Sequence, residues 1–97
     1  MKKTKGTMIA VEDDKILQSV KSMGQLEGIF AEPSGAAGFA GLQELLGNGT
    51  VQPDETVVII VTGSGLKDVE SALKVAGQAI TIDPDINEAL KILTATD

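Results

Sequence analysis

Two short segments carry the residues whose types and spacing could do chemistry. The first is Thr62-Gly63-Ser64-Gly65, which follows an uninterrupted β-branched run at 56–61. Glycine lets backbone N–H groups come close to a ligand, and the hydroxyls of Thr62 and Ser64 can donate or accept a hydrogen bond. Ligands of open α/β sheets bind at the carboxyl ends of strands. The pattern therefore predicts a ligand-binding loop, and a plain strand-to-helix turn explains it equally well.

The glycine pair in this loop does not by itself identify a nucleotide site. A dinucleotide-binding fingerprint requires a third glycine, and Asp68 stands at that position. The other candidates are charged. Glu32 precedes Pro33 at an expected helix start, where a carboxylate stabilises the helix dipole whether or not it binds a ligand. Lys67 could be a nucleophile or a phosphate ligand, but a solvated lysine before a helix is the simpler interpretation.

Metal and side-chain catalysis have little support. The cluster Glu12-Asp13-Asp14 lacks calcium-loop spacing and is better interpreted as a solvated helix start. Cysteine and histidine are both absent, which excludes thiolate nucleophiles, imidazole bases and the usual zinc ligands. We therefore predict no metal site and no catalytic side chain in this sequence.

Composition also limits the partners and the location. Lys and Arg number 8 against 14 Asp and Glu, a net charge of −6, and the only aromatic residues are Phe30 and Phe39. Nucleic-acid binding requires a basic face, so we expect no nucleic-acid partner. No apolar run reaches the roughly 18 residues of a membrane span, and the basic start lacks the apolar stretch of a signal peptide. We expect a cytoplasmic protein without membrane contact.

Alternating strand and helix patterns must position these residues. Strands are expected at 7–11, 56–61 and 79–82, and the run at 56–61 has the composition of a central strand of a parallel sheet. Helices are expected to begin at the acidic cluster at 12–14, at Pro33, after Asp68, and at Pro84 with Asp83 as the N-cap. The order βααβαβα predicts a small layered α/β fold with a short, mainly parallel sheet, formed by a single domain over residues 1–97.

The expected second helix carries glycine at every third position. Gly35, Gly38 and Gly41 form one nearly bare face, although glycine inside a helix costs about 1 kcal/mol relative to alanine. A cost of this size indicates that another segment packs very close to the helix backbone.

Taken together, these segments resemble the C-terminal part of the threonine synthases, which are pyridoxal-phosphate enzymes of the tryptophan-synthase-β-like family. The resemblance rests on two blocks, Glu27-Gly28-Ile29-Phe30-Ala31-Glu32-Pro33 and Thr62-Gly63-Ser64-Gly65-Leu66-Lys67-Asp68, with the β-branched run between them. It covers nearly the whole chain.

The resemblance implies a role for each block. The hydroxyl of Thr62 would hydrogen-bond the pyridine nitrogen of pyridoxal phosphate, with Gly63, Ser64 and Gly65 shaping the adjacent loop. Glu32 would lie near the edge of the cofactor ring. A neutral hydroxyl does not favour a protonated ring nitrogen as a carboxylate would, which suits elimination and replacement at the β and γ carbons. The complete enzyme would convert O-phosphohomoserine and water to threonine and phosphate.

Other parts of the family pattern do not occur here. The Schiff-base lysine, the phosphate-binding loop and the mobile substrate domain of the family lie in upstream sequence that this chain does not match. We therefore expect the chain to be inactive alone and to bind no cofactor alone. It would self-associate or join a partner that carries the N-terminal cofactor domain.

Two alternatives stay open. The same segment occurs in related dehydratases and in a cysteate-forming enzyme, and the chain does not separate these substrates. It could also be a non-catalytic binding or assembly module derived from such an enzyme.

Overall fold

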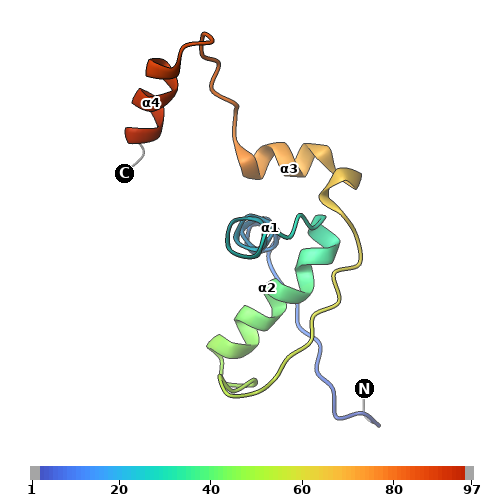
Figure 1. Cartoon of the computed structure of the whole chain (residues 1–97). Coiled ribbons are helices and arrows are strands. Elements are labelled where there is room, and N and C mark those ends of the chain that lie inside the picture. Colours follow the sequence, from blue (N-terminus) through green and yellow to red (C-terminus); the bar gives the residue numbers. More distant parts are fainter. Residues whose placement is uncertain (1–2, 96–97) are drawn as a thin grey trace.

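The computed structural model describes residues 3–95 and contains four α-helices and one short 3₁₀ turn. The elements are α1 (Asp13–Glu27), α2 (Pro33–Gly47), η1 (Gly65–Lys67), α3 (Val69–Ala76) and α4 (Ile86–Thr94). Helices α1 and α2 pack against each other, and α3 packs against α1 (Figure 1). A long stretched segment runs from the end of α2 back to the start of α3, and α4 lies apart from the other helices.

Local signals explain most helix ends. Helix α1 ends at Gly28, whose φ of 67° is a left-handed conformation that glycine adopts without strain. Helix α2 begins at Pro33, where the missing N–H removes no helical hydrogen bond. Helix α4 begins later than the sequence predicts: Asp85 is the N-cap and its Oδ1 accepts a bond from the Asn87 N–H at 2.8 Å. The prediction of Asp83 as the cap was wrong, because the helix begins at Ile86 and Asp85 supplies the capping carboxylate; the Asp83 N–H donates to Glu88 Oε2.

The prediction of an α/β fold with a mainly parallel sheet was wrong. Within residues 3–95 the three expected strands at 7–11, 56–61 and 79–82 are stretched but unpaired, and the only β pairing is an isolated antiparallel bridge between Ala31 and Ser64. The β-branched composition favours extended backbone, but a strand also needs a neighbour to satisfy its backbone groups. The described chain does not pair these three segments, although residues of 7–11 and 56–61 line one shared hollow beside α2.

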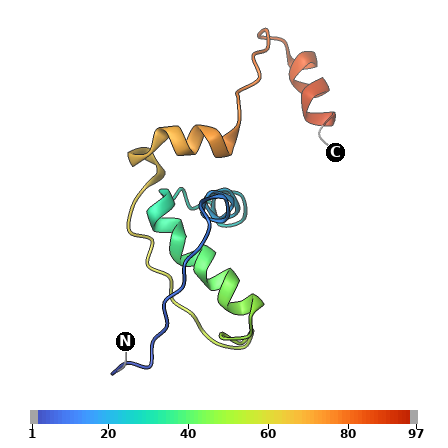
Figure 2. The ribbon, with the colours of Figure 1, turned by 180° about the vertical axis from the view of Figure 1, so that it is seen from behind.

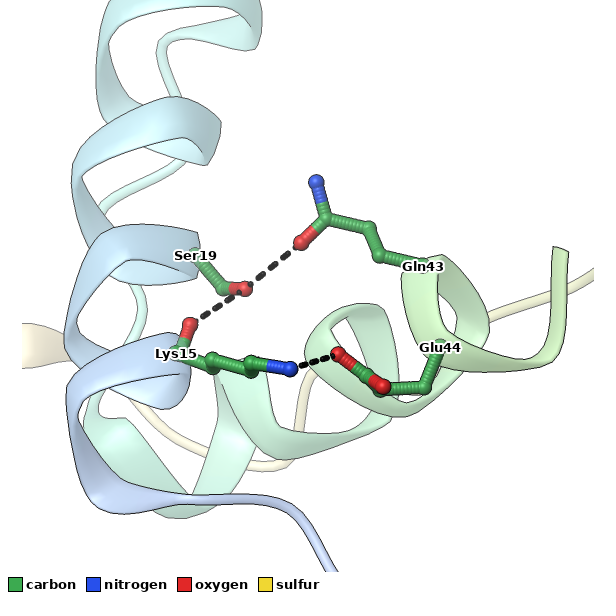
Figure 3. A network of polar contacts seen from close by, with 4 residues as sticks. All are labelled: Lys15, Ser19, Gln43 and Glu44. Carbon is green, nitrogen blue, oxygen red and sulfur yellow. Dashed lines mark hydrogen bonds and ion pairs between the residues drawn. The ribbon is translucent and has the colours of Figure 1, made fainter. Parts of the chain in front are cut away.

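The core lies between α1 and α2 and is made of small side chains. Val20, Met23, Ala31 and Ala36 are buried together, and Phe39 and Val75 pack at its edge. The two helices are also joined by polar contacts (Figure 3). The Ser19 hydroxyl is buried; it donates to the Lys15 carbonyl oxygen at 2.9 Å and lies 3.2 Å from Gln43 Oε1. Beside it, Lys15 forms an ion pair with Glu44.

The molecule is open and elongated. Its radius of gyration is 17.5 Å and its extents are 62 × 29 × 20 Å, whereas a compact chain of this length has a radius of gyration of about 12.5 Å. Figure 2 shows the same separation of α4 from the other helices when the view is reversed. Across residues 3–95, none of the helices combines the length and the apolar character needed to cross a membrane. Because the shape is open, many large apolar side chains stay exposed to solvent.

Candidate functional site

Two segments about thirty residues apart in the sequence meet at one junction. The Glu32 N–H donates to the Gly63 carbonyl oxygen, and the Gly65 N–H donates to the Phe30 carbonyl oxygen, each at 3.0 Å. These two hydrogen bonds flank the bridge between Ala31 and Ser64. The junction places Glu32 beside Gly63, Ser64 and Gly65, with Thr62 next along the chain, so all five sequence-predicted site residues lie at one place.

The Glu32 side chain lies against the backbone of the loop. Glu32 is the N-cap of α2, but its carboxylate makes no capping hydrogen bond. The side chain is only 16% exposed, and its Oε1 lies 3.8 Å from Lys67 Nζ. A Cβ atom added at Gly63 would overlap this carboxylate. A larger residue at position 63 would therefore displace the Glu32 carboxylate from its place against the loop.

The rest of the loop is shaped by contacts of the same kind. Gly65 is buried, and a Cβ atom there would overlap the ring of Phe30. Ser64 Oγ accepts a bond from the Leu66 N–H at 3.3 Å and so caps η1, which gives it a local structural role. Thr62 is exposed at the surface of the junction. Thr62 thus presents a neutral hydroxyl beside a partly buried carboxylate.

The glycine row of α2 lies under this loop. A Cβ atom at Gly35 would lie 3.2 Å from the carbonyl oxygen of Gly63 and 3.4 Å from the nitrogen of Thr62. At Gly38 it would lie 3.3 Å from Ile59 Cγ2, whereas at Gly41 it would meet nothing within 4 Å. The prediction of a closely packed neighbour is confirmed at the first two glycines. At the third, the structure shows no such neighbour.

Sequence reasoning missed two members of the junction. Lys67 was interpreted as a solvated lysine; it is largely exposed, but its ammonium group pairs with Glu32. Phe30, one of the two aromatic residues, covers Gly65. No spacing rule connects either pair, since each contact forms only when the segments around residues 30 and 64 meet. The signal available in the sequence was the glycine at 65, which indicated a close approach without naming the neighbour.

The loop ends at Asp68, whose carboxylate caps the following helix α3. Asp68 Oδ1 accepts a bond from the Ser71 N–H at 3.0 Å and caps α3. The hydrogen bonds from the Ser71 side chain and backbone hold the pKa of Asp68 below its ordinary value, with a further contribution from the charge of Lys74. Asp68 therefore serves to start α3 and anchors the loop between two fixed ends.

The junction combines the neutral hydroxyl of Thr62 with the partly buried carboxylate of Glu32, on backbone held by two hydrogen bonds. The Thr62 hydroxyl can donate to or accept from a heteroatom of a ligand, and Glu32 can accept a hydrogen bond or pair with a positive charge. Gly35 lets the backbone of α2 approach the backbone of Thr62 and Gly63 closely. The junction thus places a hydroxyl, a carboxylate and an ammonium group near one another, and the first two can hydrogen-bond a ligand.

Comparison with known proteins gives the family. A family model described as "Pyridoxal-phosphate dependent enzyme" matches residues 1–63, a range that contains Glu32, Thr62 and Gly63. The threonine synthase of Methanocaldococcus jannaschii is 42% identical over 84 residues, which are 87% of this chain and 21% of that protein. The threonine synthase of Methanosarcina acetivorans is 42% identical over 84% of this chain and 20% of that protein.

A bacterial relative gives the same result. The threonine synthase of Mycobacterium tuberculosis is 44% identical over 71 residues, which are 73% of this chain and 20% of that protein. The chain thus spans about a fifth of the length of the curated relatives that it matches. The resemblance inferred from the two blocks is confirmed, and the chain belongs to the pyridoxal-phosphate dependent enzyme family, as a segment homologous to part of threonine synthase.

Proposed function

We propose that this chain supplies the pyridine-nitrogen side of the pyridoxal-phosphate site of a threonine synthase. The complete reaction would convert O-phosphohomoserine and water to threonine and phosphate. The observation that carries the proposal is the junction itself, where Glu32 and the loop after residue 61 are tied together by backbone hydrogen bonds. Homology to threonine synthases over most of the chain supports the choice of reaction.

The residues present fit the ring of this cofactor. Thr62 is exposed and uncharged, so its hydroxyl is available to a pyridine nitrogen. Glu32 is shielded and its charge is partly balanced by Lys67, so it can lie at the ring edge without being the partner of the nitrogen. When bound, the cofactor supplies the electron sink for charge that develops on the substrate carbons. The chain's own residues bind and orient the ring.

The proposed activity requires a second polypeptide. The chain spans about a fifth of its relatives, and by the resemblance the cofactor-anchoring lysine and the phosphate-binding loop belong to the other part. The partner in this proposal is therefore a polypeptide that carries that lysine and that loop.

Complementation tests the proposal. The chain is mixed with the part of the M. jannaschii threonine synthase that it does not match, and phosphate release from O-phosphohomoserine is measured with pyridoxal phosphate present. We expect activity in the mixture and none in either piece. The variant Thr62→Val removes the hydroxyl at nearly constant shape and should lower kcat about 10- to 100-fold, the value of one hydrogen bond made in the transition state.

A matched variant controls for changes in folding and association. Thr56→Val makes the same substitution at an exposed position earlier in the same stretched segment, and we expect it to keep full activity. An inactive mixture, or equal losses from both variants, would contradict the proposal.

A further inference from the structure

The Glu32 carboxylate differs from the polar groups that begin the later helical elements. Ser64, Asp68 and Asp85 each accept a backbone N–H bond from the element that follows them, which is η1, α3 or α4. Glu32 occupies the same N-cap position on α2, but its side chain accepts no such bond. The carboxylate lies instead against Gly63, where an added Cβ atom would overlap it. Helix capping therefore does not explain where this carboxylate lies.

The burial of Glu32 makes an unpaired charge costly at this place. Its side chain is only 16% exposed. A carboxylate withdrawn from water is stable when hydrogen bonds or an opposite charge replace the hydration that it has lost. Among the described residues, the cationic group within ion-pair distance of Glu32 is Lys67, whose Nζ lies 3.8 Å from Oε1. Lys67 therefore compensates the charge of Glu32.

The backbone of Lys67 is fixed by the 3₁₀ turn η1. The Lys67 N–H donates to the Ser64 carbonyl oxygen at 3.0 Å, and the Asp68 N–H donates to the Gly65 carbonyl oxygen at 3.1 Å. The Gly65 N–H in turn ties η1 to the segment that precedes α2. Because the turn is anchored to that segment, the ammonium group reaches Glu32 across the length of a single side chain.

A second ion pair nearby shows what is particular to Lys67. Lys74 pairs with Glu70 one turn away on α3, and the Glu70 side chain is 84% exposed. Exposed pairs of this kind contribute little, because water solvates both charges equally well when they are apart. Lys67 instead joins two distant segments and meets a partly buried carboxylate. Its neighbour Asp68 does not compete for it, since Asp68 Oδ1 accepts the Ser71 N–H at the start of α3.

We propose that Lys67 is a positioning residue of the cofactor site, whose ammonium group holds the Glu32 carboxylate against the loop at Gly63. This inference rests on the proposed function, which puts Glu32 at the edge of the cofactor ring. Lys67 acts through Glu32 and touches neither cofactor nor substrate. Without Lys67 the carboxylate turns toward water, and the edge of the ring loses its fixed neighbour.

Carbon-13 NMR of the chain alone tests the contact without any cofactor. The signal of the Glu32 side-chain carboxylate is assigned by its loss in Glu32→Gln and compared at pH 7 in the wild type, Lys67→Met and Lys67→Arg. The Lys67 side chain is 66% exposed, so its replacement should not affect folding. We expect Lys67→Met to move the signal and Lys67→Arg, which keeps the positive charge, to restore it. Lys74→Met is the matched control: it removes a similarly exposed, ion-paired lysine and should leave the signal in place.

Titration of pyridoxal phosphate into the complemented mixture tests the positioning role. We expect Lys67→Met to raise the dissociation constant of the cofactor about 3- to 5-fold, the upper range for an ion pair with one exposed partner. Lys67→Arg should bind nearly as the wild type does. In a Glu32→Gln background the loss caused by Lys67→Met should disappear, because Lys67 acts only through the carboxylate.

The inference would be overturned by an unmoved Glu32 signal in Lys67→Met, by unchanged cofactor affinity in that variant, or by an equal loss of affinity in the Glu32→Gln background. Thr62→Val, titrated in parallel, separates this failure from that of the proposed function. If Thr62→Val weakens binding and Lys67→Met does not, the role of Lys67 fails and the proposed function stands. If the mixture binds no cofactor at all, both fail.

Discussion

The contact between α2 and the Thr62–Gly63 backbone leads to a sharp prediction about two glycines of one helix. Gly35 and Gly41 both lie within α2, and alanine is the better helix former at either site. They differ in what an added methyl group would meet. At Gly35 it would press on the backbone of Gly63, whereas at Gly41 it would enter open space.

The magnitudes follow from these distances. At Gly41, alanine should stabilise the chain by the full helix-propensity gain of about 0.5–1 kcal/mol. At Gly35 the gain is smaller, because this residue is in the first turn of α2. The added Cβ would lie 3.2 Å from the Gly63 oxygen and 3.3 Å from its nitrogen, tighter than ordinary van der Waals contact. Overpacking of this kind costs about 1–3 kcal/mol.

The loop at Thr62 and Gly63 cannot move away from α2 without disturbing the junction. The Gly63 carbonyl that would be pushed is the acceptor of the Glu32 N–H, so moving it breaks or lengthens a hydrogen bond of the junction. We therefore expect Gly35→Ala to be net destabilising by about 1 kcal/mol, which places it about 2 kcal/mol below Gly41→Ala.

Denaturant unfolding followed by far-UV circular dichroism measures the difference. The two single variants and the wild type are compared at one low chain concentration, so that self-association does not enter. Gly38→Ala should fall between them, because its neighbour is the Ile59 side chain, which can turn aside. Equal stabilisation by Gly35→Ala and Gly41→Ala would refute the close approach of the loop to α2.

Two further predictions concern the core and the start of α3. Met23→Ala removes a buried side chain from the small α1–α2 core and should lower the free energy of unfolding by about 2 kcal/mol, again by denaturant unfolding. Because folding lowers the pKa of Asp68, the capping contribution is complete above the unfolded pKa of about 4 and is lost as pH falls through the lower folded value. Helicity should therefore decrease in that acid range, and Asp68→Asn, which still caps, should flatten the decrease; an identical acid profile in Asp68→Asn would assign it to other carboxylates.

Local signals in the sequence were sufficient for the first three helices and for part of the junction, whereas the start of α4 was placed two residues too early. Gly28, Pro33 and Gly77 mark helix ends through backbone properties that no distant contact changes. The glycine row indicated a close neighbour because its cost in a helix needs a compensating contact, and Gly35 and Gly38 have one. Such properties belong to single residues or to one turn of helix, so they can be read without knowing the fold.

The strands could not be predicted in the same way. Extended backbone at 56–61 follows from β-branching, but a sheet requires neighbouring strands, and the described chain does not pair any with it. The contacts of Glu32 with Gly63 and Lys67 likewise depend on two distant segments meeting. The resemblance to a known family identified Glu32 and the loop at 62–65 as site residues. The contacts of Lys67 and Phe30, and the distances within the junction, came only from the structure.

Binding of pyridoxal phosphate to the complemented mixture tests the central claim most directly. The cofactor is titrated into the mixture and its absorbance is followed for the wild type, Thr62→Ser and Thr62→Val. If Thr62 holds the ring nitrogen, Thr62→Ser should bind as the wild type does, and Thr62→Val should bind about tenfold more weakly, as expected for one lost hydrogen bond. Equal affinity and equal absorbance of all three would contradict the assignment of the Thr62 hydroxyl to the cofactor.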